Sequence, residues 1–158
     1  MPNNQYELAQ INIAQGLGEI DDPVMQGFAD RLHEINALAD QAPGFVWRLQ
    51  TEDGDATSLR AYDDSRMLVN MSVWQDVASL KTFVYRTMHV ELLKDRKEWF
   101  TKLTKPHFCM WWIPQGHIPT VDEAKAILDI LDSMGPTTEA FTFAKAFPPP
   151  TNNYSIRN

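Results

Sequence analysis

The segment FVYRTMHVELLKDRKEWF, residues 83–100, contains the side chains best suited to chemistry in this chain. Read as a helix, it places Tyr85, His89, Leu92, Arg96 and Trp99 on one stripe, because residues three or four apart share a helix face. A phenol, an imidazole and a guanidinium on a stripe that should face the core indicate one of two arrangements. Either the stripe borders a polar cavity, or it is the solvated edge of an ordinary helix.

Three residues of this stripe are candidate catalytic groups. The imidazole of His89 suits general acid or base chemistry and can also ligate iron or zinc, and Tyr85 lies one turn before it. Arg96 can offer a two-pronged guanidinium to a carboxylate or an enolate oxygen. The alternatives are a histidine that hydrogen-bonds a backbone carbonyl at a helix break and an arginine that pairs with neighbouring surface charges.

Two asparagines and three aromatic residues are candidate ligand-binding groups. Asn12 and Asn70 interrupt otherwise apolar, strand-like segments, and a buried amide must find a partner or bind something. Each of them either orients a ligand or faces outward at a strand edge. Trp74, Phe83 and Trp99 are expected to form pocket wall or core and not to react themselves.

Other constellations of reactive residues are missing from the sequence. His33, His107 and His117 show neither HxxxH nor HExxH spacing, so no metal site is predicted. Phosphate-binding loops, dinucleotide fingerprints and the nucleophilic G-x-S-x-G motif are also missing. Cys109 is the only cysteine and lies within an apolar segment, which predicts a buried, inert thiol and excludes a disulfide within the chain.

The composition predicts one globular domain over residues 1–147, followed by a proline-rich polar tail at 148–158. The chain has 158 residues, of which 44% are hydrophobic and 22% charged. Its formal net charge of −7 repels phosphate backbones, so nucleic acid is not an expected partner. No signal-like start and no run of about 18 apolar residues occurs, which predicts a cytoplasmic protein without a membrane partner.

The periodicity of the apolar residues predicts an α+β fold. The first helix begins after Asp22 and stops at Pro43, the second runs from Asp76 past Trp99 with a break near residues 86–88, and the third has a capping box. The order β-α-β-β-α-β is the split βαβ arrangement of ferredoxin-like folds with an antiparallel sheet. The predicted strands are residues 5–14, 45–51, 67–74 and 107–113, and the C-terminal additions are a helix over 120–135 and a short strand within 140–147.

The strand at 107–113 is apolar on both sides, so both faces of the sheet must be covered. The first two helices cover only one face. The other face would remain a large exposed apolar patch, and a second copy of the sheet is the simplest cover, which predicts a homodimer. In the alternative, the third helix and the C-terminal segment fold back over that face.

Several segments together carry a resemblance to a known family. They are ELAQINIA, DDPVMQGFADRLHEINALADQAPGFVWRLQ, LVNMSVWQDVASLKTFVYRTMHVELLKDRKEWF and MWWIPQGHIPTVDEAKAILDILDSMGPTTEAFTF. The chain resembles a bacterial family of domains of unknown function that is placed among the dimeric α/β-barrel proteins. The resemblance extends from about Leu8 to Phe143. That superfamily includes the antibiotic-biosynthesis monooxygenases, heme enzymes, isomerases and binding proteins.

The resemblance implies a cofactor-independent monooxygenase that acts on a small apolar or aromatic molecule. Heme-degrading members use an asparagine, a tryptophan and a histidine, and by position Asn12 and His89 resemble the first and last of these. Phe83 occupies the position of the tryptophan. A heme-binding or heme-degrading protein and a non-catalytic binder of a hydrophobic metabolite are therefore the alternatives, and no cofactor is expected except heme in the former.

Overall fold

The computed structural model describes residues 5–50, 57, 60–88 and 96–150. Within them the chain forms one antiparallel sheet in which β1 pairs with β3, β4 and β5, and β3 pairs with β2. The order β2-β3-β1-β5 is that of a ferredoxin-like fold, which confirms the predicted α+β class. The strands are β1 (Tyr6–Gly16), β2 (Phe45–Arg48), β3 (Met67–Trp74), β4 (Phe100–Thr101) and β5 (Phe108–Pro114).

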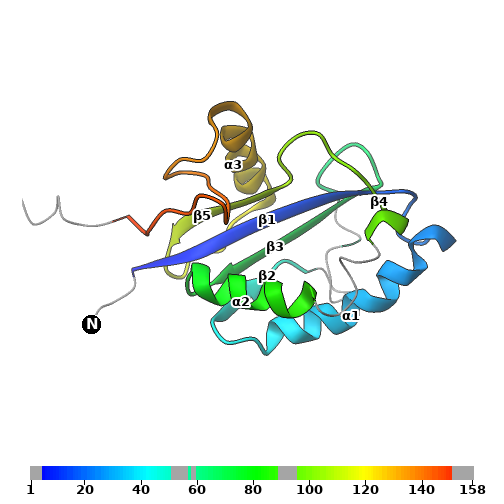
Figure 1. The fold of residues 1–158 in the computed structure, drawn as a ribbon, viewed down its shortest axis with the longest axis horizontal. Helices are drawn as coiled ribbons and strands as arrows, with labels where there is room; N and C mark the ends of the chain where they lie inside the picture. The colour runs from blue at the N-terminus through cyan, green and yellow to red at the C-terminus, as the bar shows by residue number, and fades with distance from the viewer. Residues whose placement is uncertain (1–4, 51–56, 58–59, 89–95, 151–158) are drawn as a thin grey trace, which may run out of the picture.

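Three helices cover the two faces of this sheet. Figure 1 shows α1 (Gln26–Asp40) and α2 (Val77–Met88) on one face and α3 (Val121–Met134) on the other. A short 3-10 helix, η1 (Pro23–Met25), leads into α1, and its cap is Asp22, whose carboxylate accepts from Val24 N at 2.9 Å. No helix in the described part of the chain is long and apolar enough to cross a membrane.

The third helix has the boundaries that the sequence predicts. Thr120 Oγ1 accepts from Glu123 N at 3.1 Å and satisfies one of the free amides of the first turn. Gly135 ends the helix with a φ of 72°, a backbone conformation that glycine adopts without strain.

The second helix is described only as far as Met88, so the predicted break near residues 86–88 and residues 89–95 lie at or beyond the limit of the described residues. The chain then forms the 3-10 helix η2 (Arg96–Glu98), and Trp99 is not helical, so the prediction of a helix that continues past Trp99 is wrong. Phe100 and Thr101 instead pair with Gly16 and Gln15 and form β4, a strand that the sequence analysis did not predict.

The C-terminal segment contributes a bridge where a short strand was predicted. Phe141 exchanges backbone hydrogen bonds with Met110 at 2.8 and 3.0 Å, and the chain turns on both sides of it. These turns place the fully buried Phe141 ring on the core and prevent a longer ladder. Most of the predicted tail at 148–158 lies outside the described residues.

The sheet face opposite α1 and α2 is covered by the chain's own third helix. Ile11, Met71 and Trp111 are at most 3% exposed, and this face of the sheet packs against Leu128 and Leu131 of α3. The premise for a homodimer, an apolar face without cover, is therefore wrong for the described residues. The alternative, in which α3 folds back over the sheet, is what the structure shows, and the homodimer itself stays a prediction.

Candidate functional site

A cavity of about 240 Å³ lies between the sheet and the two helices α1 and α2. The inner strands β1 and β3 form its floor, and the apolar residues of the two helices form its walls. Residues that line it include Gln10, Asn12 and Ala14 of β1, Leu68, Asn70, Ser72 and Trp74 of β3, Phe28, Leu32, Asn36 and Ala39 of α1, and Leu80, Phe83 and Val84 of α2.

Four polar side chains form the centre of the floor, and we call Gln10, Asn12, Asn70 and Ser72 the polar patch. Alternate residues of a strand point to the same face, so Gln10 and Asn12 of β1, like Asn70 and Ser72 of β3, share the cavity side of the sheet. The register places Gln10 opposite Ser72 and Asn12 opposite Asn70. The polar patch is therefore fixed by the pairing of β1 with β3.

Hydrogen bonds connect three of the four residues of the polar patch. Gln10 Nε2 donates to Asn70 Oδ1 at 2.8 Å and to Ser72 Oγ at 2.7 Å, and Trp74 Nε1 donates to the same Ser72 oxygen at 2.8 Å. Gln10, Ser72 and Trp74 are at most 6% exposed. Because Ser72 Oγ already accepts twice, its O–H is left to donate. Asn12 lines the cavity, is exposed and makes no side-chain hydrogen bond to any described residue.

Aromatic rings stand at two ends of the cavity. The Trp74 and Phe83 rings lie 5.1 Å apart and 31° from parallel. Phe28 and Phe100 meet edge to face at 5.0 Å. These four residues line the cavity, so a ligand with a flat ring meets aromatic surfaces at both ends.

The sequence analysis missed several polar residues of the cavity, among them Gln10, Ser72, Asn36 and Arg48. Asn36 lies on the inner stripe of α1, four residues after Leu32, where a helix presents its core face. The signal was present, since a polar residue interrupts an otherwise apolar stripe. Arg48 is the one charged residue among the described residues of the lining, and it forms a two-pronged pair with Asp40 at 2.7 and 3.3 Å.

The structure brings together four of the predicted site residues. Asn12, Asn70, Trp74 and Phe83 all line the cavity, although they lie on three different elements. The amides of Asn12 and Asn70 face each other across β1 and β3, as close cross-strand neighbours do.

Tyr85 and Trp99 lie elsewhere. Tyr85 is 58% exposed and is not part of the lining, because α2 turns Leu80, Phe83 and Val84 toward the sheet. The prediction that the Tyr85 phenol faces inward is therefore wrong. Trp99 is 6% exposed and packs on Phe28 at 6.1 Å, so it supports a wall of the cavity from behind.

The remaining predicted residues fall outside what the structure describes. His89, the predicted base or heme ligand, belongs to residues 89–95, which are not described. The backbone of Arg96 lies in η2, but its side chain is outside the described part. Their roles stay predictions.

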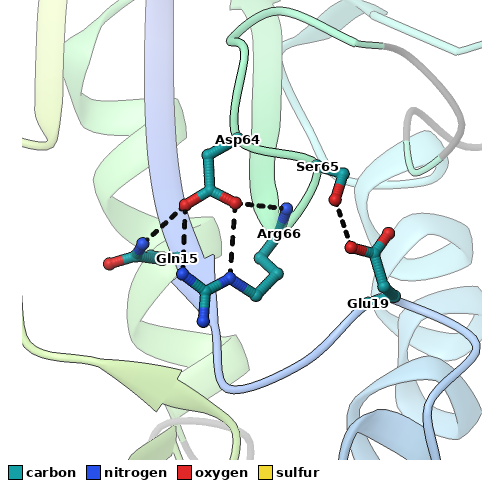
Figure 2. Close-up of polar contacts among 5 residues, drawn as sticks. All are labelled: Gln15, Glu19, Asp64, Ser65 and Arg66. Carbon is teal, nitrogen blue, oxygen red and sulfur yellow. Dashed lines mark hydrogen bonds and ion pairs between the residues drawn. The ribbon is translucent and has the colours of Figure 1, made fainter.

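A second polar cluster lies away from the cavity, where β1 ends and β3 begins (Figure 2). Asp64 accepts from Gln15 Nε2 at 2.7 Å and from the Arg66 backbone and guanidinium at 2.9 and 3.3 Å. The hydrogen bonds from Arg66 and Gln15 lower the pKa of Asp64 to about 2. Ser65 also donates to Glu19, so the cluster ties the turn before β3 to the loop after β1.

The other titratable side chains do not assemble into a metal site. Among the described residues, no group of three or more histidine, cysteine, aspartate or glutamate side chains is placed to hold a metal ion. Cys109 is fully buried, and burial raises the pKa of its thiol to about 12. The described residues around the cavity can supply hydrogen bonds in an otherwise apolar site.

One family and three solved structures are similar to the chain. The family described as Domain of unknown function (DUF3291) matches residues 7–157. SnoaB, a cofactor-independent oxygenase from Streptomyces nogalater that was solved as a mutant, is 16% identical, with 71% of this chain and 95% of that chain covered and a TM-score of 0.46. No curated protein matches the chain at a significant level.

The other two similar structures come from Pseudomonas aeruginosa and Nitrosomonas europaea. The former, PA3566, is 11% identical over 73% of this chain and 100% of that chain, with a TM-score of 0.49. The latter, NE2512, a protein of unknown function, is 11% identical over 75% of this chain and 97% of that chain, with a TM-score of 0.45. All three are distant similarities.

Proposed function

The chain belongs to the DUF3291 family, and we propose that its cavity binds a small, flat aromatic molecule with oxygen substituents and promotes its oxidation by O₂ without a cofactor. One observation carries this proposal. The polar patch lies on the floor of a cavity whose other walls are apolar and aromatic. A few fixed polar groups in an apolar pocket are typical of small-molecule sites.

The volume of the cavity limits the size of the molecule. A cavity of roughly 150 Å³ holds benzene. The cavity here, at about 240 Å³, is larger and suits a molecule of about two fused rings. Stacking against Trp74 or Phe83 would orient such a ring system.

The polar patch supports the chemical part of the proposal. The Asn12 amide and the Ser72 hydroxyl can donate to a phenolic or enolic oxygen as it loses its proton. Neutral donors that are already oriented stabilise such an oxyanion strongly in an apolar site. We propose His89, which directly follows α2 in the sequence, as the base, and Arg96 as a further partner of the oxyanion.

The proposed reaction uses O₂ as the only oxidant. The electron-rich anion reduces O₂, and a ring CH₂ group becomes a carbonyl that retains one oxygen atom. The second oxygen atom leaves as water with the two hydrogens of that CH₂ group. The chain's own residues hold the oxyanion.

Oxygen consumption tests the proposal. A panel of anthrones and hydroxylated naphthalenes should include at least one compound for which the protein accelerates O₂ uptake, with label from isotopic O₂ in the product. Asn12→Ala and His89→Ala should reduce the rate at least tenfold, whereas Gln75→Ala, an exposed control beyond β3, should not. Unchanged rates in both site variants would refute the roles of these residues.

A non-catalytic binder is the second candidate function. The observation that favours it is the lining itself, because its described residues include no carboxylate and no imidazole. Such a protein would bind the same aromatic molecules and release them unaltered. Native mass spectrometry of protein purified from its host would then show a retained small molecule, and O₂ uptake would equal that of buffer.

A further inference from the structure

Asn36 is a buried amide without a hydrogen-bond partner among the described residues. Its residue is 8% exposed, and it makes no side-chain hydrogen bond to any described residue. Among the described residues, every fully buried side-chain nitrogen or oxygen has a hydrogen-bond partner. Because Asn36 has none, its amide atoms must be in contact with open space. The space that Asn36 lines is the cavity.

A position of this kind normally favours an apolar side chain. Burying an amide without a partner costs stability, and asparagine is also a poorer helix former than leucine. The neighbouring residues on the same stripe, Leu32 and Ala39, are apolar. A buried polar group that the fold does not need is a candidate for binding.

Asn36 and the polar patch border the cavity from opposite layers. Asn36 lies on α1, and the polar patch lies on β1 and β3 beneath it. We propose that Asn36 is a ligand-binding residue that determines specificity, and that the site takes a bicyclic aromatic molecule with a polar group at each of two opposite ends. This inference rests on the cavity being the ligand site of the proposed function.

The charges around the cavity indicate that both polar groups are neutral. Asp40 engages Arg48 in a two-pronged pair, and the other described lining residues carry no charge. A carboxylate next to Asn36 would have to lose its hydration shell, and the described lining offers no cation there besides Arg48, which pairs with Asp40. An asparagine amide both donates and accepts, so hydroxyl and carbonyl groups fit it.

A comparison of two ligands on two proteins tests the inference. Naphthalene-2,6-diol has hydroxyls at its two far ends, and 2-naphthol has only one. We expect calorimetric titration to show wild-type protein binding the diol about fivefold more tightly, the effect of one net hydrogen bond. Asn36→Leu should abolish this preference, because the second hydroxyl of the diol loses its partner. A preference that persists in the variant, or the failure of both compounds to bind wild-type protein, would overturn the inference.

The stability of the free protein is an independent readout. If Asn36 serves a ligand, Asn36→Leu should raise the melting temperature, and by more than His33→Leu, an exposed control on the same helix that measures the gain in helix propensity alone. A structural asparagine would give the opposite sign, and a lower melting temperature would contradict the inference.

The two proposals can fail separately. A diol preference that depends on Asn36, without any O₂ uptake, would refute the proposed oxidation and retain the ligand site. Unchanged O₂ uptake and KM in Asn36→Leu, with unchanged binding of both naphthols, would refute the role of Asn36 and retain the proposed oxidation.

Discussion

Gln10 and Ser72 face each other across β1 and β3, and Gln10 Nε2 donates to Ser72 Oγ at 2.7 Å. The same oxygen accepts from Trp74 Nε1 at 2.8 Å. One hydroxyl therefore fixes both a polar group of the cavity floor and the ring that forms a cavity wall. Both donors are almost fully buried, so neither can turn to bulk water if the hydroxyl is lost.

Ser72→Ala should destabilise the protein more than an ordinary serine substitution. The change leaves two buried N–H groups without their acceptor, and we expect a loss of about 1–3 kcal/mol in the free energy of unfolding. Urea denaturation would measure it, with Ser133→Ala, at an exposed position of α3, as the control. A loss equal to that of the control would mean that the hydroxyl does not organise the floor.

Cys109 should be unreactive in the folded protein. Burial raises the pKa of its thiol to about 12, which suppresses the reactive thiolate at neutral pH. A disulfide reagent such as Ellman's reagent should label the protein only after unfolding. Rapid labelling of the native state, with unchanged circular dichroism, would contradict the position of Cys109 inside the sheet.

The carboxylate of Glu123 should make stability depend on acid pH. Burial raises the pKa of Glu123, but hydrogen bonds from His117 at 2.8 Å and Trp111 at 3.1 Å outweigh it and lower the pKa below 4.5. A lowered pKa stabilises the folded state above 4.5, and this contribution disappears as the pH falls through the folded-state pKa.

Glu123→Gln should therefore reduce the free energy of unfolding by about 1 kcal/mol at neutral pH. The difference from wild type should shrink once the pH is below the folded-state pKa of Glu123. Urea denaturation at neutral pH and at a pH below the folded-state pKa would measure the free energy of unfolding. Asp122→Asn serves as a control for the charge at the start of α3. A difference that does not vary with pH would show that the charge of Glu123 is not the cause.

The oligomeric state tests the role of α3 as a cover. Since α3 buries Ile11, Met71 and Trp111 within one chain, this sheet face is not free to drive association. If light scattering after size exclusion gives twice the 18.1 kDa of one chain, we expect that dimer to use another surface and to persist when exposed residues of α3 are mutated. A dimer that dissociates on mutation of α3 would contradict this expectation and support the homodimer predicted from the sequence.

The fold followed closely from local patterns in the sequence. The β3 strand and the third helix were predicted at their observed boundaries, because alternation and capping are encoded by neighbouring residues. The short strand β4 was not predicted, since Phe100 and Thr101 pair with β1 through contacts distant in sequence. That α3 covers the second face of the sheet was predicted only as the alternative to a homodimer. The sequence could not decide, because the face on which α3 packs depends on tertiary contacts.

The site was predicted only in part, because local patterns reveal single residues but not how they meet in the fold. Asn12 and Asn70 stood out because each interrupts an apolar strand, and both line the cavity. Tyr85 was misplaced because the predicted stripe followed the wrong face of α2, whose residues Leu80, Phe83 and Val84 line the cavity instead. Asn36 was missed because a single amide on an amphipathic helix resembles the edge of its polar face, and only its burial distinguishes it.

A crystal structure of the protein with naphthalene-2,6-diol would test the central claim most directly. The account predicts that the ring system lies between the polar patch and α1, with one hydroxyl within hydrogen-bonding distance of Asn12 or Ser72 and the other within hydrogen-bonding distance of Asn36. A diol bound outside this cavity, or a cavity filled by the chain's own side chains, would contradict it.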